Sequence, residues 1–282
     1  HRGNKMINNW LARGDTHGNF NWMYNGCLDN YEPEETAIII LGDCGLEFYL
    51  NKTDERKKKE VDARGYYIYW VRGNHEARAS DVKGYEKIFD ENVHGVVYCD
   101  PRFPHLRAFL DYGFYEINGY TCYVIGGAYS VDKYYRLARA GMTTATNNPK
   151  KSGWFANEQL TIEEMKEVEK QLHDFDAADK VIDFMFTHTC PYSWEPRDLF
   201  LGVVDQSTVD DTMEKWLDKV KNIATGYVWC FGHFHDDRLV RPHVEMFYHN
   251  IEELDKIYQR WQNYDATGDL DWWLKKGPNF DN

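Results

Sequence analysis

Five short apolar segments, separated by polar segments with helical spacing, constrain the fold of this chain more than any other feature. The apolar segments have strand length and are rich in β-branched or aromatic residues; they cover residues 36–42, 66–73, 120–127, 180–188 and 226–233. The polar segments have the apolar spacing of surface helices; they cover residues 51–65, 157–175 and 207–222. This alternation predicts an α/β fold.

Side chains that can bind metal ions follow four of these five apolar segments. They stand at or just beyond the segment ends and are Asp43, Asn74, His188, His233 and His235. Each alone has an ordinary alternative as a turn or core residue. In open α/β sheets, however, ligand sites gather at the carboxyl ends of strands. We therefore expect these side chains to converge on one crevice.

An aspartate and a histidine stand two residues apart in the segment RGDTHGNF, residues 13–20. On a strand, positions i and i+2 point to the same side, so Asp15 and His17 could meet one ligand where the strand ends. The same letters are also typical of a helix start or a turn. The motif becomes informative only together with the other strand ends.

Seven donors stand at these positions, namely four imidazoles, two carboxylates and one amide oxygen, from Asp15, His17, Asp43, Asn74, His188, His233 and His235. One ion takes about four to six ligands, so seven donors fit two divalent ions that share one carboxylate. Mixed imidazole and oxygen ligation suits manganese, iron, zinc or nickel better than calcium or magnesium. Cys44 is a less favoured ligand, because its side chain should point away from that of Asp43.

The ordered motifs G-D-T-H-G, G-D, G-N-H-E, T-H and G-H-F-H, spread over residues 14–235, resemble those of the calcineurin-like metallophosphoesterase superfamily. The resemblance implies a four-layer αββα sandwich with two mixed β-sheets and a dinuclear metal site at the carboxyl ends of strands. It implies that one ion is held by Asp15, His17, Asp43 and His235. The other ion would be held by Asp43, Asn74, His188 and His233, with Asp43 bridging.

The same resemblance implies metal-dependent hydrolysis of phosphomonoesters or phosphodiesters. Two ions about 3.5–4 Å apart turn a bridging water into hydroxide near neutral pH and clamp the phosphoryl oxygens. His75 matches the family's histidine that contacts the phosphate and protonates the leaving group, a role that suits the ordinary imidazole pKa of about 6.5. Asp43 and His75 are therefore the expected catalytic residues.

Three further residues are candidates for substrate binding: Asn19, Lys133 and Arg136. Asn19 closes the first motif and could reach the substrate or serve only in packing. Lys133 and Arg136 follow a predicted strand, where they could bind phosphate or belong to a structural loop. The segment 193–200 is a candidate cap that could shape specificity through Trp194 and Arg197, although core packing is the default expectation for Trp194.

The second motif departs from that of the protein Ser/Thr phosphatase branch, which continues as G-D-x-x-D-R-G. In that branch the second Asp orients the catalytic histidine and the Arg binds phosphate. Here the sequence is GDCGLEFY, so Leu46 and Glu47 replace that pair. We therefore expect a small phosphoester or nucleotide as substrate. Phosphoprotein hydrolysis and a non-catalytic metal-binding scaffold are the alternatives. Glu47 could reach His75, although a solvated loop position is favoured.

Length and charge bound the remaining properties. We expect one domain over residues 1–250 and a polar C-terminal tail, residues 251–282, that packs on it. The chain carries 33 basic and 46 acidic residues, a net charge of −13, which disfavours stable binding to nucleic acid or to an anionic membrane. No apolar run approaches the roughly 18 residues of a membrane span.

The six cysteines form no C-x-x-C pair and are expected to be buried, reduced thiols of a cytoplasmic protein. The oligomeric state is left open.

Overall fold

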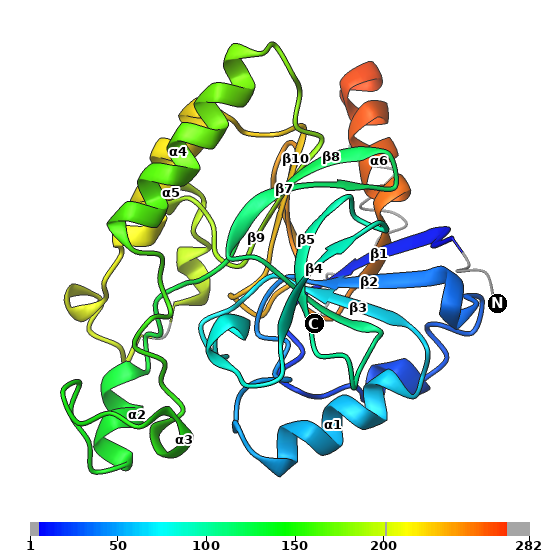
Figure 1. Ribbon diagram of the computed structural model, residues 1–282. Helices are drawn as coiled ribbons and strands as arrows, with labels where there is room; N and C mark the ends of the chain where they lie inside the picture. The colour runs from blue at the N-terminus through cyan, green and yellow to red at the C-terminus, as the bar shows by residue number, and fades with distance from the viewer. Residues whose placement is uncertain (1–5, 201, 270–282) are drawn as a thin grey trace.

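Two mixed β-sheets form the centre of the molecule, and helices lie outside them (Figure 1). The computed structural model describes residues 6–200 and 202–269. Within them the first sheet has seven strands in the order β13 (Ile251–Glu253), β1 (Asn9–Arg13), β2 (Thr36–Ile40), β3 (Tyr67–Trp70), β6 (Leu106–Phe109), β5 (Gly95–Cys99) and β4 (Glu86–Asp90). The second has six, in the order β11 (Arg238–Arg241), β12 (Val244–Met246), β10 (Val228–Phe231), β9 (Phe184–Thr187), β8 (Tyr120–Ile125) and β7 (Tyr112–Ile117).

Parallel pairing brings the ends of the central strands to one edge of each sheet. In the first sheet β1, β2 and β3 are parallel, and in the second sheet β8, β9 and β10 are parallel. The antiparallel partners lie toward the sheet edges, as β13, β5 and β4 do in the first sheet and β7 and β11 do in the second. Because parallel strands end at the same edge, the residues that follow them are placed side by side.

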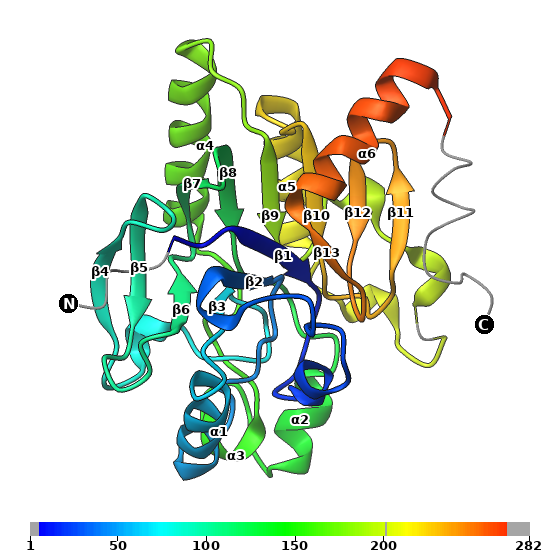
Figure 2. The same cartoon turned by 90° about the vertical axis from the view of Figure 1, so that its right-hand side faces the viewer.

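Helices cover the outer faces of both sheets (Figures 1 and 2). The described helices are α1 (Lys52–Asp62), α2 (Lys133–Arg139), α3 (Pro149–Ser152), α4 (Ile162–Ala177), α5 (Thr212–Ile223) and α6 (Leu254–Thr267). Val168 of α4 and Leu217 of α5 share a hydrophobic cluster with Trp229 of the second sheet. Val61 of α1 shares another with Ile38 of the first sheet.

A third hydrophobic cluster fills the space between the two sheets. It joins Ile39 and Tyr69 of the first sheet to Phe184 and Phe186 of the second, and the two phenylalanine rings are stacked with centroids 5.3 Å apart. With apolar side chains buried on both faces of each sheet, the order of layers is helix, sheet, sheet, helix. This arrangement confirms the predicted α/β class and the αββα sandwich.

The five strands and three helices expected from the sequence are all present, each shorter than its pattern. The helix expected over 157–175, for example, begins at Ile162, because Thr161 and Glu164 form a reciprocal capping box there. None of the helices in the described part of the chain is long and apolar enough to cross a membrane. All six cysteines are free thiols; five are buried as expected, whereas Cys27 is exposed.

The C-terminal boundary differs from the expectation of a polar tail after residue 250. Residues 251–253 form β13, which pairs antiparallel with β1, and α6 follows at once. Leu254, Ile257 and Trp261 of α6 are fully buried in the cluster between the sheets. The remainder of the expected tail, residues 270–282, lies outside the described residues. Up to residue 267 the segment is therefore part of the domain, and its polar character belongs to the outer face of an amphipathic helix.

Candidate metal centre

The residues expected to bind metal lie together where strands of both sheets end. Asp15, Asp43 and Asn74 follow β1, β2 and β3, and the histidines follow β9 and β10, apart from His17 after β1. In the described part of the chain, two groups of donors are close enough to hold an ion: Asp15, His17 and His235, and Asp43, His188 and His233. Within each group the donor atoms lie within 4.8 Å of one another. Asn74 adjoins the second group, with its Oδ1 2.8 Å from His188 Nε2.

Each carboxylate is anchored through one oxygen and presents the other to the imidazoles. Oδ1 of Asp15 accepts a hydrogen bond from the backbone N–H of His233, and Oδ1 of Asp43 accepts one from the backbone N–H of His75. Oδ2 of Asp15 lies 3.2 Å from Nε2 of His235. Oδ2 of Asp43 lies 3.5 Å from Nε2 of His188 and 3.9 Å from Nε2 of His17. Asp43 thus faces both groups, as a carboxylate shared by two ions must.

The ring nitrogens of the histidines converge on each other. Nε2 of His17 and Nε2 of His235 are 2.9 Å apart, and Nε2 of His188 is 3.2 Å from Nδ1 of His233. Nδ1 of His188 lies 2.8 Å from the carbonyl oxygen of Leu41, to which it can donate its hydrogen, so Nε2 is left as a lone-pair donor toward the site. Lone pairs that face one another at these distances fit a cation between them.

The orientation of Asn74 is set by two residues that the motifs did not identify. The amide nitrogen of Asn74 donates to the hydroxyl of Ser130 at 2.8 Å, and that hydroxyl donates to Oε2 of Glu158 at 2.5 Å. Because Ser130 takes the amide nitrogen, the amide oxygen of Asn74 points at the site. Ser130 and Glu158 are both buried. No local sequence signal marks Glu158, which lies just before α4.

Glu76, the last residue of the G-N-H-E motif, joins two of the ligand loops. Its carboxylate accepts hydrogen bonds from the backbone N–H of Gly73, at 2.5 Å, and of Gly45, at 3.4 Å. Glu76 is 1% exposed, and burial raises the pKa of its carboxyl to about 7. Its position therefore fixes the loop after β2 relative to the loop after β3.

The buried carboxylates of Asp15 and Asp43 favour a cation at the site. Burial opposes ionisation of Asp15 and Asp43, yet the imidazole of His188 and its neighbours hold the pKa of both carboxyls below the usual range. Burial also opposes the charged form of His188, but Asp43 and Asp15 raise its pKa to about 9. Burial and the adjacent His188 lower the pKa of His233 to about 3. Without a metal ion, the two buried carboxylates draw a proton onto His188; divalent ions bound at the site would supply that positive charge instead.

Several site residues occupy the left-handed region of backbone conformation. His17, Asp43, His233 and His235 have φ values of 47°, 47°, 72° and 56°. Such values are uncommon outside glycine and occur at sites that the surrounding structure holds in place. Close packing also excludes a side chain at Gly42, the residue before Asp43: a Cβ there would lie 1.9 Å from Nδ1 of His188. The ligand geometry therefore depends on backbone angles as well as on side-chain types.

Comparison with known protein families adds an independent observation. The family model described as calcineurin-like phosphoesterase matches residues 11–237, which include all seven predicted ligands. The chain belongs to the calcineurin-like phosphoesterase family. Membership confirms the resemblance seen in the motifs and implies metal-dependent phosphoester hydrolysis.

The other comparisons are more distant. No curated protein matches this calcineurin-like phosphoesterase significantly. Among solved structures, one crystal structure is similar at a TM-score of 0.44 and 13% sequence identity, over 88% of this chain and 95% of the other.

His75, the histidine expected to protonate the leaving group of the substrate, lies beside the metal-binding groups of this phosphoesterase. His75 lines the same pocket as Asp43, His233 and His235, and its Nδ1 is buried with no hydrogen-bond partner among the described residues. The rings of His75 and His17 are 5.9 Å apart. Burial lowers the pKa of His75, an effect that Asp43 opposes. The ordinary imidazole pKa assumed from the sequence therefore does not hold in the free protein.

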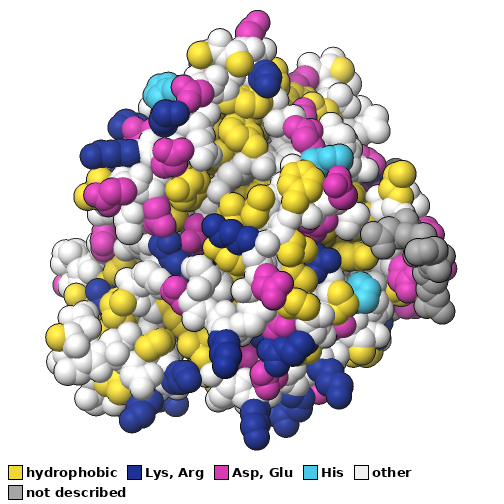
Figure 3. Space-filling model, in the orientation of Figure 1, with side chains coloured by type: hydrophobic (Ala, Val, Ile, Leu, Met, Phe, Trp, Pro, Cys, Tyr) yellow, Lys and Arg dark blue, Asp and Glu magenta, His cyan; other side chains and the backbone are white. Residues whose placement is uncertain are grey.

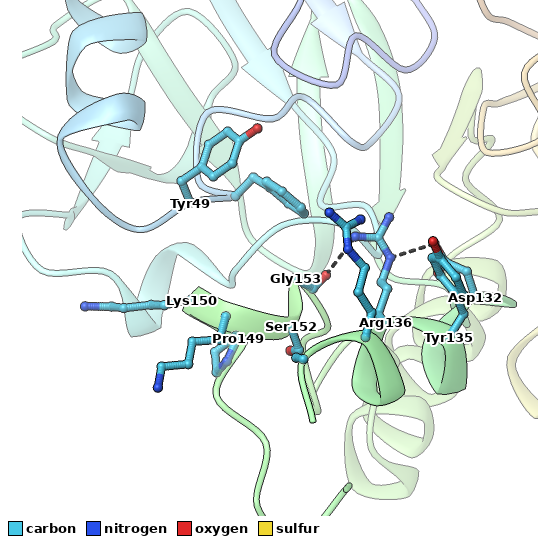
Figure 4. Close-up of a pocket in the computed structure, with 12 residues that line it drawn as sticks. Tyr49, Asp132, Tyr135, Arg136, Pro149, Lys150, Ser152 and Gly153 are labelled. Carbon is cyan, nitrogen blue, oxygen red and sulfur yellow. Dashed lines mark hydrogen bonds and ion pairs between the residues drawn. The ribbon is translucent and has the colours of Figure 1, made fainter. Parts of the chain in front are cut away.

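The three candidate substrate-binding residues of the phosphoesterase lie outside the pocket that contains His75. Asn19 is exposed, and its Oδ1 accepts a hydrogen bond from the backbone N–H of Asn21. Nζ of Lys133 lies 4.6 Å from the ring centroid of Trp154. Arg136 lines a neighbouring pocket of about 400 Å³, where it contacts Asp132 and the carbonyl of Gly153 (Figure 4). Asp132 lines both pockets, so Arg136 lies next to the site rather than in it.

Glu47 occupies neither of the positions expected from the sequence. It is 2% exposed, which excludes a solvated loop, and its carboxylate pairs with Lys58 at 2.5 Å and accepts the hydroxyl of Tyr85 at 2.6 Å. Lys and Arg side chains gather along the lower edge of the face in Figure 3, where α1 lies, but Lys58 of α1 turns inward. Glu47 therefore compensates a buried lysine and does not orient His75.

We expect Glu47→Gln to destabilise the protein by about 3–5 kcal/mol, because the substitution removes the carboxylate that pairs directly with the buried ammonium of Lys58. The measurement is urea unfolding followed by circular dichroism. The control is Glu55→Gln, which removes the exposed partner of Arg102 and should cost about 1 kcal/mol or less. Similar losses in the two variants would contradict the role given to Glu47.

Proposed function

We propose that the protein hydrolyses small phosphomonoesters or phosphodiesters, nucleotides included, with two divalent metal ions. The observation that carries the proposal is the position of Asp43, whose Oδ2 faces imidazole nitrogens of both donor groups. A carboxylate shared in this way is what a dinuclear centre requires. Manganese, iron, zinc and nickel all suit the imidazole and oxygen donors.

The residues of the chain have separate roles in this proposal. Asp15, His17, Asp43 and His235 would hold one ion, and Asp43, Asn74, His188 and His233 the other. When bound, the ions supply an activated water and neutralise charge on the phosphoryl group. His75, beside both groups, donates a proton to the leaving oxygen, and a bound phosphate would favour its protonated form. Arg136 and Lys133 would contact parts of the substrate beyond the phosphoryl group.

The environment of Glu47 argues against phosphoproteins as the main substrate. The arginine that clamps phosphate in the protein Ser/Thr phosphatases is replaced here by a carboxylate committed to Lys58. The carboxylate of Glu47 therefore cannot bind phosphate, and breaking its ion pair with Lys58 would be costly. The complete set of donors likewise favours an enzyme over a non-catalytic scaffold. We further propose a cytoplasmic location and no stable binding of nucleic acid, as the charge and the reduced thiols suggest.

We expect the metal-loaded protein to hydrolyse p-nitrophenyl phosphate, or its bis ester, at least as efficiently as phosphoserine peptides. The comparison is made on kcat/KM with each candidate metal, and the metal content is measured on the same samples. A strong preference for phosphopeptides would favour the phosphoprotein alternative. No hydrolysis of any ester by a fully loaded protein would favour the scaffold.

A further inference from the structure

A pocket of about 580 Å³ extends from the metal-binding groups to residues 192–200, residues 204–211 and the start of α5. Asp43, Asn74 and His75 line it at the catalytic end. The other end combines apolar side chains, namely Leu199, Phe200, Val204, Val209 and Phe234, with charged side chains. The volume suits a ligand of drug-like size. The part of a substrate that leaves with the alcohol oxygen would occupy this end.

One buried carboxylate in this pocket lacks a full set of partners. Glu214, in the first turn of α5, is 5% exposed. Its Oε1 accepts a hydrogen bond from the hydroxyl of Thr189 at 3.1 Å, whereas its Oε2 is buried with no hydrogen-bond partner among the described residues. A buried polar atom in that state is costly unless a ligand completes it.

The other carboxylates at this end of the pocket each face a cationic side chain. The pairs are Asp132 with Arg136 at 2.6 Å, Asp211 with Lys215 at 2.8 Å and Glu195 with Arg197 at 3.8 Å. Glu214 has no such pair among the described residues, and burial raises the pKa of its carboxyl to about 7. Glu214 is therefore the one carboxylate at this end of the pocket, among the described residues, that has no cationic partner.

A third metal ion does not fit this position. In the described part of the chain, groups of three or more close metal donors occur only at the two sets around Asp15 and Asp43, and Glu214 belongs to neither. A neutral hydrogen-bond donor would complete Oε2 but would do little to favour ionisation of a carboxyl whose burial opposes it. A protonated amine supplies both the hydrogen and the charge, and its carbon chain suits the apolar side chains of the pocket.

Building on the function proposed above, we propose that Glu214 binds a protonated amino group on the leaving group of the substrate. The natural substrates are then phosphoesters of amino alcohols in which an apolar chain separates the phosphate from a primary or secondary ammonium. The metal-binding groups and His75 would engage the phosphate end, and Glu214 would select the amine end.

The test compares two matched series of phosphate monoesters on the metal-loaded enzyme. One series is ω-aminoalkyl phosphates with two to eight carbons; the other is alkyl phosphates in which a methyl group replaces the ammonium. We expect kcat/KM at the best chain length to favour the amine by about 10- to 100-fold, as for a hydrogen bond between charged groups. In Glu214→Gln this ratio should fall to within about threefold of unity. Glu163→Gln, which removes an exposed carboxylate from α4, should keep it.

A binding measurement separates this inference from the phosphoesterase proposal. Calorimetry with hexylammonium should show binding to the wild-type protein, weakened at least about tenfold in Glu214→Gln, whether or not any ester is hydrolysed. Thermal melting of the same variant establishes that it is folded. Equal kcat/KM for the two series, or an amine preference that survives in Glu214→Gln, would overturn the assignment. Hydrolysis of p-nitrophenyl phosphate without any preference for amines would support the phosphoesterase function and contradict the proposed role of Glu214.

Discussion

We expect the Asp43→Asn variant to bind fewer than two metal ions per chain and to lose phosphoester hydrolysis. The substitution keeps the size of the side chain and its hydrogen bond from the backbone of His75. It removes the negative charge that Oδ2 presents to both donor groups, so neither ion keeps its shared ligand. Metal content measured by mass spectrometry should fall from two ions per chain to one or none.

The control for this variant is Asp90→Asn, another buried aspartate, which bonds Tyr69 and Arg107 away from the site. The Asp90→Asn variant should be less stable than the wild type but should still bind two metal ions. An Asp43→Asn protein with two ions and normal activity would show that the dinuclear assignment is wrong.

His75→Asn is expected to keep both metal ions and to lower kcat by roughly 10²- to 10⁴-fold for alkyl phosphates, whose leaving oxygen needs a proton. The loss should be much smaller for p-nitrophenyl phosphate, because p-nitrophenolate departs without protonation. The measurement is kcat for a series of esters with leaving groups of increasing acidity, in the variant and in the wild type.

Simple phosphate binding by His75 would penalise all esters alike, so the dependence on the leaving group distinguishes the two roles. An equal loss across the series would assign His75 to binding. Loss of metal from the variant would instead make His75 a ligand, contrary to its absence from both groups of close donors in the described part of the chain.

The central strands and the residues after them could be predicted because both have local signals. β2, β3, β8, β9 and β10 are buried on both faces and appear in the sequence as continuous apolar runs. Because parallel strands of a sheet end at the same edge, the donors that follow these strands could be expected to lie together. The edge strand β4 is mostly exposed, and its neighbour β5 alternates buried and less buried residues, so neither forms a continuous apolar run.

The errors concern residues whose partners are distant in the sequence or depend on tertiary packing. Glu47 was expected in solvent, but its partner Lys58 lies on the inner face of α1, in a run of charges that is typical of a solvated helix. Glu158 acts on Asn74 only through Ser130, across 84 residues of chain. α6 looked like a polar tail because its mean composition hides the buried face that carries Trp261. The contacts of Glu47 and Glu158 are set by the fold and have no local signal, whereas the helical spacing of Leu254, Ile257 and Trp261 is a local signal that the sequence prediction missed.

The pairing of β13 with β1 has a consequence for how the chain folds as it is synthesised. β1 and the first ligands emerge from the ribosome early, yet β1 is an inner strand only once residues 251–253 have been made and have paired with residues 11–13. His233 and His235 also arrive late, after every other donor. Contacts this far apart in sequence form slowly, and until then β1 is an open edge that another chain could pair with. The nascent protein therefore cannot close its first sheet, or complete either metal site, until nearly all of the domain has been translated.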